Sequence, residues 1–284
     1  MADVTLWSTP TVTHVIPGDT GVKAVTSLDD RVYVVRCDKN EVEIYDTATM
    51  TLQRRLPVPE ISWDASGIAA CPRNKCLYLS DWNDPSIHRV DLATDAAKKW
   101  PVAKSPHGLS VNGDHNLLVA CSCGKKLQEY TTDGRLVREI CLKAAVRVGS
   151  PSHAIQLSTG DYVVNQFTRK SLNVLSVVGM DGELLHSNYD PLRDFFLATA
   201  ELRKDPIRSL AVTKHGNILH ADEDNNSILV INSLLIRVKL FSLPADVELQ
   251  EPRALYLDET LDRLYIGECS GKCRVIVLNN LSSV

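Results

Sequence analysis

The stretch "GNILHADEDNNSILVIN", residues 216–232, contains two apolar runs separated by the acidic and amide-rich segment Asp222–Asn226. A calcium loop of the EF-hand type needs a glycine at its sixth position and a glutamate at its twelfth. Counted from Asp222, those positions hold Ser227 and Ser233, so the motif is absent. Asp and Asn side chains favour turns because they bond nearby backbone N–H groups. We therefore interpret the segment as a turn between two strands.

The pattern around this stretch recurs along the chain. In six copies, a small or polar residue is followed by an apolar residue, here called the anchor, and then by alternating apolar and polar residues. The anchors are Val25, Ile68, Leu109, Ile155, Leu210 and Leu255. Successive anchors are 43, 41, 46, 55 and 45 residues apart. Each copy continues with a second apolar run, a polar loop and an alternating run such as "EVEIYD" (41–46), and most copies end in a fourth run. Four strands in ~45 residues is the period of a propeller blade.

The sequence therefore predicts an all-β fold, a single domain over residues 1–284 that forms a six-bladed β-propeller of four-stranded blades. A parallel βαβ protein is disfavoured, because five of the six copies leave no room for a crossover helix. The sixth copy lacks a convincing fourth strand, whereas "VTHVI" (Val12–Ile16) precedes the first copy. We expect this N-terminal strand to complete the last blade and close the ring, which removes an exposed edge.

The connection between copies four and five is the longest and contains "DPLRDFFLATAELRK" (190–204). Asp190 is a suitable N-cap, with Pro191 at the first helical position. The apolar residues that follow fall on one helical stripe. We expect one short inserted helix here, docked on the propeller.

Composition argues for a protein that neither crosses a membrane nor carries a strong charge. The net charge is −4 and the pI is near 6.1, which gives no global reason to expect nucleic acid or an anionic membrane. No apolar run approaches the ~18–20 residues of a membrane span, and the start "MADVTLWSTP" lacks the features of a signal peptide. We expect a cytoplasmic monomer without a cofactor, whose eight cysteines are free thiols.

The opening stretch resembles the NHL-repeat signature, in which a strand that ends in Ala-Asp precedes an Asn-containing loop and an alternating strand. Blade five carries the match through Gly216, Ala221, Asp222, Asn226 and Ile228. Blade three keeps "PHGLSV" (106–111) and blade six keeps "PRALYL" (252–257). The resemblance implies the C-terminal propeller of tripartite-motif proteins, which binds protein partners or RNA. The chain has no RING or B-box pattern, so no ligase activity is implied.

Propeller topology places the start of each innermost strand and the second-to-third-strand loops on one face, here called the mouth face. Two aromatic residues, Trp82 and Phe167, are expected on loops of this face. The first position of the repeat is expected at the mouth of the central channel in every blade. These candidate binding residues are Lys23, Ser66, His107, His153, Arg208 and Arg253.

Two classes of function fit these residues. The first is a non-catalytic recognition propeller that binds a protein segment or an anionic ligand, RNA among them, at the channel mouth; a protein partner is favoured, because acidic loops argue against a broad nucleic-acid footprint. The second is a metal-dependent enzyme of the lactonase or lyase kind, with an ion on His107 and His153. A catalytic zinc has three protein ligands as a rule, and no third histidine occupies an equivalent place. The residues thus favour binding over catalysis and leave the question open.

Overall fold

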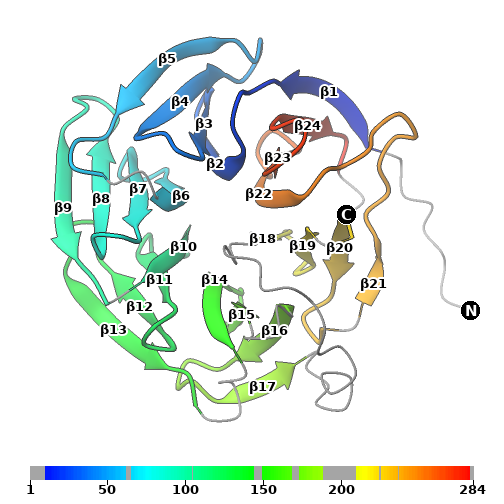
Figure 1. Ribbon diagram of the computed structural model, residues 1–284. Coiled ribbons are helices and arrows are strands. Elements are labelled where there is room, and N and C mark those ends of the chain that lie inside the picture. The colour runs from blue at the N-terminus through cyan, green and yellow to red at the C-terminus, as the bar shows by residue number, and fades with distance from the viewer. Residues whose placement is uncertain are drawn as a thin grey trace, which may run out of the picture.

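The computed structural model describes residues 10–61, 65–103, 105–143, 149–167, 173–187, 209–223, 225–235 and 237–281. Within these ranges the chain forms six antiparallel sheets of four strands each. The sheets are arranged as blades around a central axis (Figure 1). The prediction of an all-β, six-bladed propeller is therefore confirmed.

One strand of each blade lies next to the axis (Figure 1). The innermost strands are β2 (Val22–Leu28), β6 (Ala65–Cys71), β10 (Pro106–Val111), β14 (Ser150–Gln156), β18 (Leu210–Val212) and β22 (Pro252–Asp258). The second strands are β3 (Arg31–Arg36), β7 (Cys76–Asp81), β11 (Leu117–Cys121), β15 (Tyr162–Phe167), β19 (Ile218–Asp222) and β23 (Arg263–Glu268).

The third and fourth strands of each blade complete the sheet towards the outside. The third strands are β4 (Glu41–Asp46), β8 (Ser86–Asp91), β12 (Lys126–Tyr130), β16 (Asn173–Val178), β20 (Ser227–Ile231) and β24 (Val275–Asn279). The outer strands are β5 (Leu52–Pro57), β9 (Ala97–Pro101), β13 (Leu136–Cys141), β17 (Leu184–Ser187), β21 (Arg237–Leu240) and β1 (Thr11–Ile16).

The ring closes through the first strand of the chain. β1 pairs antiparallel with β24, from Thr11 opposite Asn279 to Ile16 opposite Val275, and so becomes the outer strand of blade six. Ile16 is buried against the core between blades six and one. The predicted closure by Val12–Ile16 is confirmed, with one more residue at its start.

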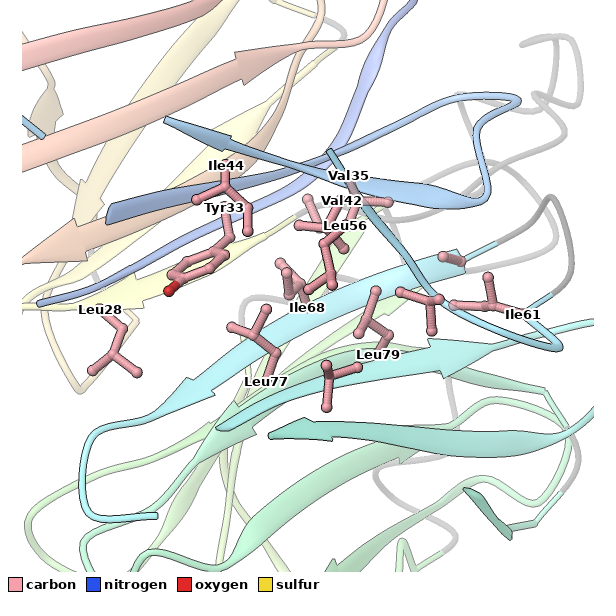
Figure 2. Close-up of a cluster of buried hydrophobic side chains, with 14 residues drawn as sticks. Leu28, Tyr33, Val35, Val42, Ile44, Leu56, Ile61, Ile68, Leu77 and Leu79 are labelled. Atoms are coloured by element: carbon pink, nitrogen blue, oxygen red, sulfur yellow. The ribbon is translucent and has the colours of Figure 1, made fainter. Parts of the chain in front are cut away.

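The core lies between neighbouring blades. Strands whose side chains alternate between two buried faces bring apolar residues to both neighbours, which is why the second and third strands read as nearly continuous apolar runs. Between blades one and two, Val35 and Ile44 of one sheet pack with Ile68 and Leu79 of the next (Figure 2). The outer strands are mostly exposed, as the pattern of β5 illustrates.

Aspartates at strand ends shape the turns. Asp222 accepts a hydrogen bond from the backbone N–H of Asn225 at 3.3 Å, and Asp81 accepts two from Asn83 and Asp84 at 3.1 Å each. Asn226 adopts a left-handed conformation with φ of 50°. The interpretation of Asp222–Asn226 as a turn is therefore confirmed.

Three further expectations concern the inserted helix, membrane-spanning segments and the cysteines. The predicted helix in 190–204 lies outside the described residues, and so does Arg208. Among the residues that the structure describes, no helix is long and apolar enough to cross a membrane. All eight cysteines are free.

Candidate functional site

Among the described residues, the innermost strands of five blades carry a β-bulge near their start, whereas β18 of blade five pairs regularly with β19. In blade one, Val22 pairs with Arg36 and Ala24 with Val35, so Lys23 is the extra residue. The same irregularity places Ser66 between Ala65 and Gly67 in blade two. A bulge bends its strand and redirects a side chain away from the regular alternation. The repeat's first position is thus a special backbone position.

The bulge recurs in three more blades. In blade six it includes Arg253, and in blade three it includes His107. In blade four, however, Pro151 pairs with Gln166 and His153 with Asn165, so the extra residue is Ser152. His153 therefore stands one place further along than the repeat alignment predicts. The repeat pattern could not determine the strand register in blade four, because Ala154 and Ile155 are both apolar. The alignment is equally good with either residue as the anchor.

Arg253 is paired at the mouth. Its Nη2 lies 3.4 Å from Oε1 of Glu223, and both side chains are almost fully buried. Glu223 belongs to the β19–β20 loop, in the middle of the stretch that defines the repeat. An acid from the neighbouring blade thus neutralises the charge of Arg253 at the mouth. In sequence, nothing distinguishes Glu223 from its turn-forming neighbours.

His153 connects three blades. Its Nδ1 accepts a hydrogen bond of 2.9 Å from the backbone N–H of Leu210, and its Nε2 lies 3.1 Å from the carbonyl oxygen of Leu109. Because Nδ1 accepts a backbone proton, Nε2 carries the ring proton and donates it to Leu109. Burial lowers the pKa of His153 to about 4, so the ring is neutral at pH 7. His153 contributes no positive charge to the mouth.

A metal site on His107 and His153 is not supported by this geometry. Both ring nitrogens of His153 are engaged with backbone groups of other blades, so no lone pair is available for an ion. Within the described residues, no group of three or more His, Cys, Asp or Glu side chains is arranged to hold a metal.

A cavity of about 390 Å³ runs along the channel behind the mouth. Residues from all six innermost strands line it, from Lys23 and Ser66 at the mouth to Pro72 and His115 in turns of the opposite face. Its walls include Val25, Ile68, Leu109, Ile155, Leu210 and Leu255. A mostly apolar cavity of this size with few polar groups is typical of a small-molecule site. The sequence analysis missed this cavity, because the anchors were read only as core residues.

The two aromatic candidates differ in their surroundings. Trp82 lies in the β7–β8 loop of the mouth face and is 45% exposed. The carboxylate of Asp81 fixes the loop beside it through the backbone bonds of Asn83 and Asp84. Phe167 is the last residue of β15 rather than a loop residue, and it is half-buried. Trp82 is the more available anchor for a partner.

Comparison with known proteins identifies the fold but no family. Neither a protein-family model nor a curated protein sequence matches the chain. Virginiamycin B lyase from Staphylococcus aureus is similar in structure, with a TM-score of 0.67 and 12% identity over 94% of this chain and 98% of that chain. The WD40 β-propeller domain of Doa1 matches with a TM-score of 0.61 and 12% identity over 96% of this chain and 98% of its own.

A third solved structure, the β-propeller domain of Cps50 (Swd1) from Myceliophteria thermophila, has a TM-score of 0.61 and 12% identity over 95% of this chain and 99% of its own. The neighbours thus include an enzyme as well as propeller domains. At such low identity the likeness shows the propeller fold alone, and function has to be argued from the site.

Proposed function

We propose that the protein is a non-catalytic recognition propeller of the NHL-like kind, which binds a segment of a partner protein at its mouth face. One observation carries this proposal: the exposed side chain of Trp82 lies on the same face as the channel mouth. Buried polar side chains at bulge positions surround that mouth, among them Lys23, Ser66 and Arg253. Aromatic anchors next to fixed polar groups are typical of protein interfaces.

The charges near the mouth support a protein partner over RNA. Glu223 neutralises Arg253, and Asp84 of the Trp82 loop forms an ion pair of 2.5 Å with Lys99. A surface on which both signs alternate suits the mixed charges of a polypeptide. Phosphate recognition instead favours an uninterrupted basic patch. The similarity to WD40 propeller domains is compatible with this role.

The metal-dependent enzyme is not proposed as a second function. It required His107 and His153 to share an ion, and the backbone bonds of His153 leave it no nitrogen for that purpose.

The test compares two single substitutions on opposite faces. Trp82→Ala removes the exposed aromatic ring from the mouth face, whereas Leu261→Ala removes an exposed apolar side chain, 37% accessible, from the β22–β23 turn of the opposite face. Proteins captured by the wild type are identified by mass spectrometry, and the affinity of each purified candidate is then measured directly.

We expect Trp82→Ala to weaken a genuine mouth partner by about 30-fold, the effect of losing an interface hot spot of ~2 kcal/mol. Leu261→Ala should leave the affinity unchanged. Equal binding by both variants would exclude a Trp82-centred interface. Recovery of RNA that depends on Trp82 would replace the protein partner by a nucleic acid.

A further inference from the structure

Two cysteines meet where the first and last blades join. Cys37 directly follows β3 of blade one, and Cys269 directly follows β23 of blade six. The two residues are 232 positions apart in the sequence. Their side chains nevertheless form a hydrogen bond between the two thiols. Both side chains are also partly exposed, so an oxidant in solution reaches a pair of sulfur atoms that already lie next to each other.

The backbone of Gly21 holds the two cysteines close together. The backbone N–H of Cys37 donates to the carbonyl oxygen of Gly21 at 2.7 Å. On the other side, a Cβ at Gly21 would overlap the carbonyl oxygen of Cys269 and would lie 3.1 Å from its Cα. Both cysteines thus pack against the same glycine, which allows this approach because it has no side chain.

Hydrogen bonds fix the two loops that carry these cysteines. Nη1 of Arg36, the residue before Cys37, donates to the carbonyl oxygen of Cys273 in the β23–β24 loop at 2.9 Å. The backbone N–H of Cys269 donates to the carbonyl oxygen of Glu251 at 3.0 Å. A disulfide forms only within a narrow range of separations and directions of the two cysteines. Loops that are held in this way keep the sulfur atoms in reach without a rearrangement of the blades.

The contact between the thiols gives them different roles in an oxidation. The hydrogen bond to Cys37 and burial raise the pKa of Cys269, so its sulfur keeps its proton at pH 7. Oxidants react with a thiolate and not with a thiol. We therefore expect Cys37 to be oxidised first and Cys269 to be the resolving thiol beside it.

We propose that a two-electron oxidant such as hydrogen peroxide joins Cys37 and Cys269 in a disulfide that fastens blade one to blade six on the mouth face. The peroxide transfers one oxygen to the sulfur of Cys37, which becomes a sulfenic acid, and its other oxygen leaves as water. The sulfur of Cys269 then attacks the sulfenic sulfur. The S–O bond breaks, and the departing hydroxide takes the proton of Cys269. Two thiols and one peroxide thus give one disulfide and two molecules of water.

The test measures both the bond and its effect on stability. The reduced protein is treated with a small excess of hydrogen peroxide under native conditions, alkylated and digested without reduction. Mass spectrometry should find a peptide pair that links Cys37 to Cys269, and dithiothreitol should separate it. The bond closes a loop of 233 residues, and a disulfide stabilises a protein more as its loop grows. We expect the oxidised protein to melt about 5–10 °C above the reduced protein.

Three substitutions assign the bond. Cys37→Ser and Cys269→Ser should each abolish the linked peptide pair and the rise in melting temperature. Cys141→Ser replaces an exposed thiol at the end of β13 in blade three and is the matched control. It should respond to peroxide as the wild type does. Each variant is compared with its own reduced form, so a serine that lowers stability by itself does not affect the result.

Three outcomes would overturn the inference. A peptide that links Cys269 to Cys273 would confine the oxidation to one loop and leave the blades unconnected. Absence of the linked pair, with Cys37 intact or oxidised only to sulfinic or sulfonic acid, would show that Cys269 is out of its reach. A linked pair without a higher melting temperature would show that the bond does not fasten the blades. The comparison of Trp82→Ala with the wild type uses reduced protein, so the proposed function stands or falls independently of this bond.

Discussion

At the scale of single residues, His153 shows how burial changes a role that the sequence suggested. A histidine exposed to solvent gains a positive charge as the pH falls towards ~6.5. In the structure the ring is a neutral link between backbone groups of blades three and five. Its lowered pKa follows from burial, which disfavours the charged form.

The first prediction follows from this pKa. Between pH 6.5 and about 4 the unfolded chain protonates His153 and the folded chain does not, so stability falls as the pH is lowered through this window. The loss amounts to on the order of 3 kcal/mol by pH 4. His153→Gln retains one donor and one acceptor but cannot be protonated. We expect its unfolding free energy to depend less steeply on pH in this window, by about one proton, in denaturant titrations.

The control for this prediction is His186→Gln, on the exposed outer strand β17. It should follow the wild-type pH dependence. A His153→Gln curve parallel to that of the wild type would show that His153 is accessible to protons in the folded state.

The second prediction concerns the small residue beside His153. A Cβ on Gly108 would overlap the His153 ring and lie 2.7 Å from the carbonyl oxygen of Ser152. Gly108→Ala should therefore destabilise the protein by about 1–3 kcal/mol, the usual cost of overpacking. Gly113→Ala, in the next turn of the same blade, meets no atom within 4 Å and should be close to neutral. Chemical denaturation of the two variants checks this, and equal midpoints would contradict it.

At the scale of elements, the strand order is the same in all six blades, although their sequences differ. The period of about 45 residues and the alternating third strands were sufficient to predict the strand order of every blade. The register at the innermost strand was not predictable in blade four, because a run of apolar residues fits two alignments equally well. Bulges depend on backbone geometry that alternation does not encode, so Ser152 was not identified as the bulged residue.

The third prediction concerns the closing strand β1. Deleting residues 1–17 should expose the edge of β24 and remove Ile16 from the core, with aggregation or loss of cooperative unfolding as the result. Ile16→Ala alone should cost about 2–4 kcal/mol. Val15→Thr, on the exposed side of the same strand, should change stability by less than about 0.5 kcal/mol. A truncated protein that melts like the intact one would show that β1 is dispensable.

At the scale of the whole molecule, the buried Arg36 joins the first and last blades at the seam, the place where the two blades meet and the ring closes. Arg36 bonds the carboxylate of Glu43 at 2.5 Å and donates to the carbonyl oxygens of Pro17 and Thr20, between β1 and β2. It also donates to the carbonyl oxygen of Cys273 in blade six. A single guanidinium group thus connects both ends of the ring.

The fourth prediction tests this connection. Arg36→Met leaves the buried Glu43 with only the exposed Arg55, 3.6 Å away, as a cation and should cost about 3–5 kcal/mol. The double variant with Glu43→Gln should recover part of that loss. Arg54→Met breaks an exposed ion pair with Asp95 and should cost at most about 1 kcal/mol. Thermal unfolding of the four proteins provides the measurement, and a similar cost for Arg36→Met and Arg54→Met would refute the role of the seam.

The candidate site was only partly predictable, because it is assembled from distant parts of the chain. The positions of Lys23, Ser66 and Arg253 at the mouth followed from the repeat alone. The pairing of Arg253 with Glu223 and the bonds of His153 join different blades, and a pattern within one blade contains no information about them. The cavity likewise depends on how closely six strands approach the axis.

The pairing of β1 with β24 also bears on the order of events during synthesis. Thr11 leaves the ribosome before its partner Asn279, which is added 268 residues later. Throughout that interval β1 has no native neighbour in its own blade, although five complete blades can already form behind it. At ~5–20 residues per second, the nascent chain carries this unpaired strand for at least about 13 s. Chaperones that shield exposed strands would therefore act on this protein mainly while it is being translated.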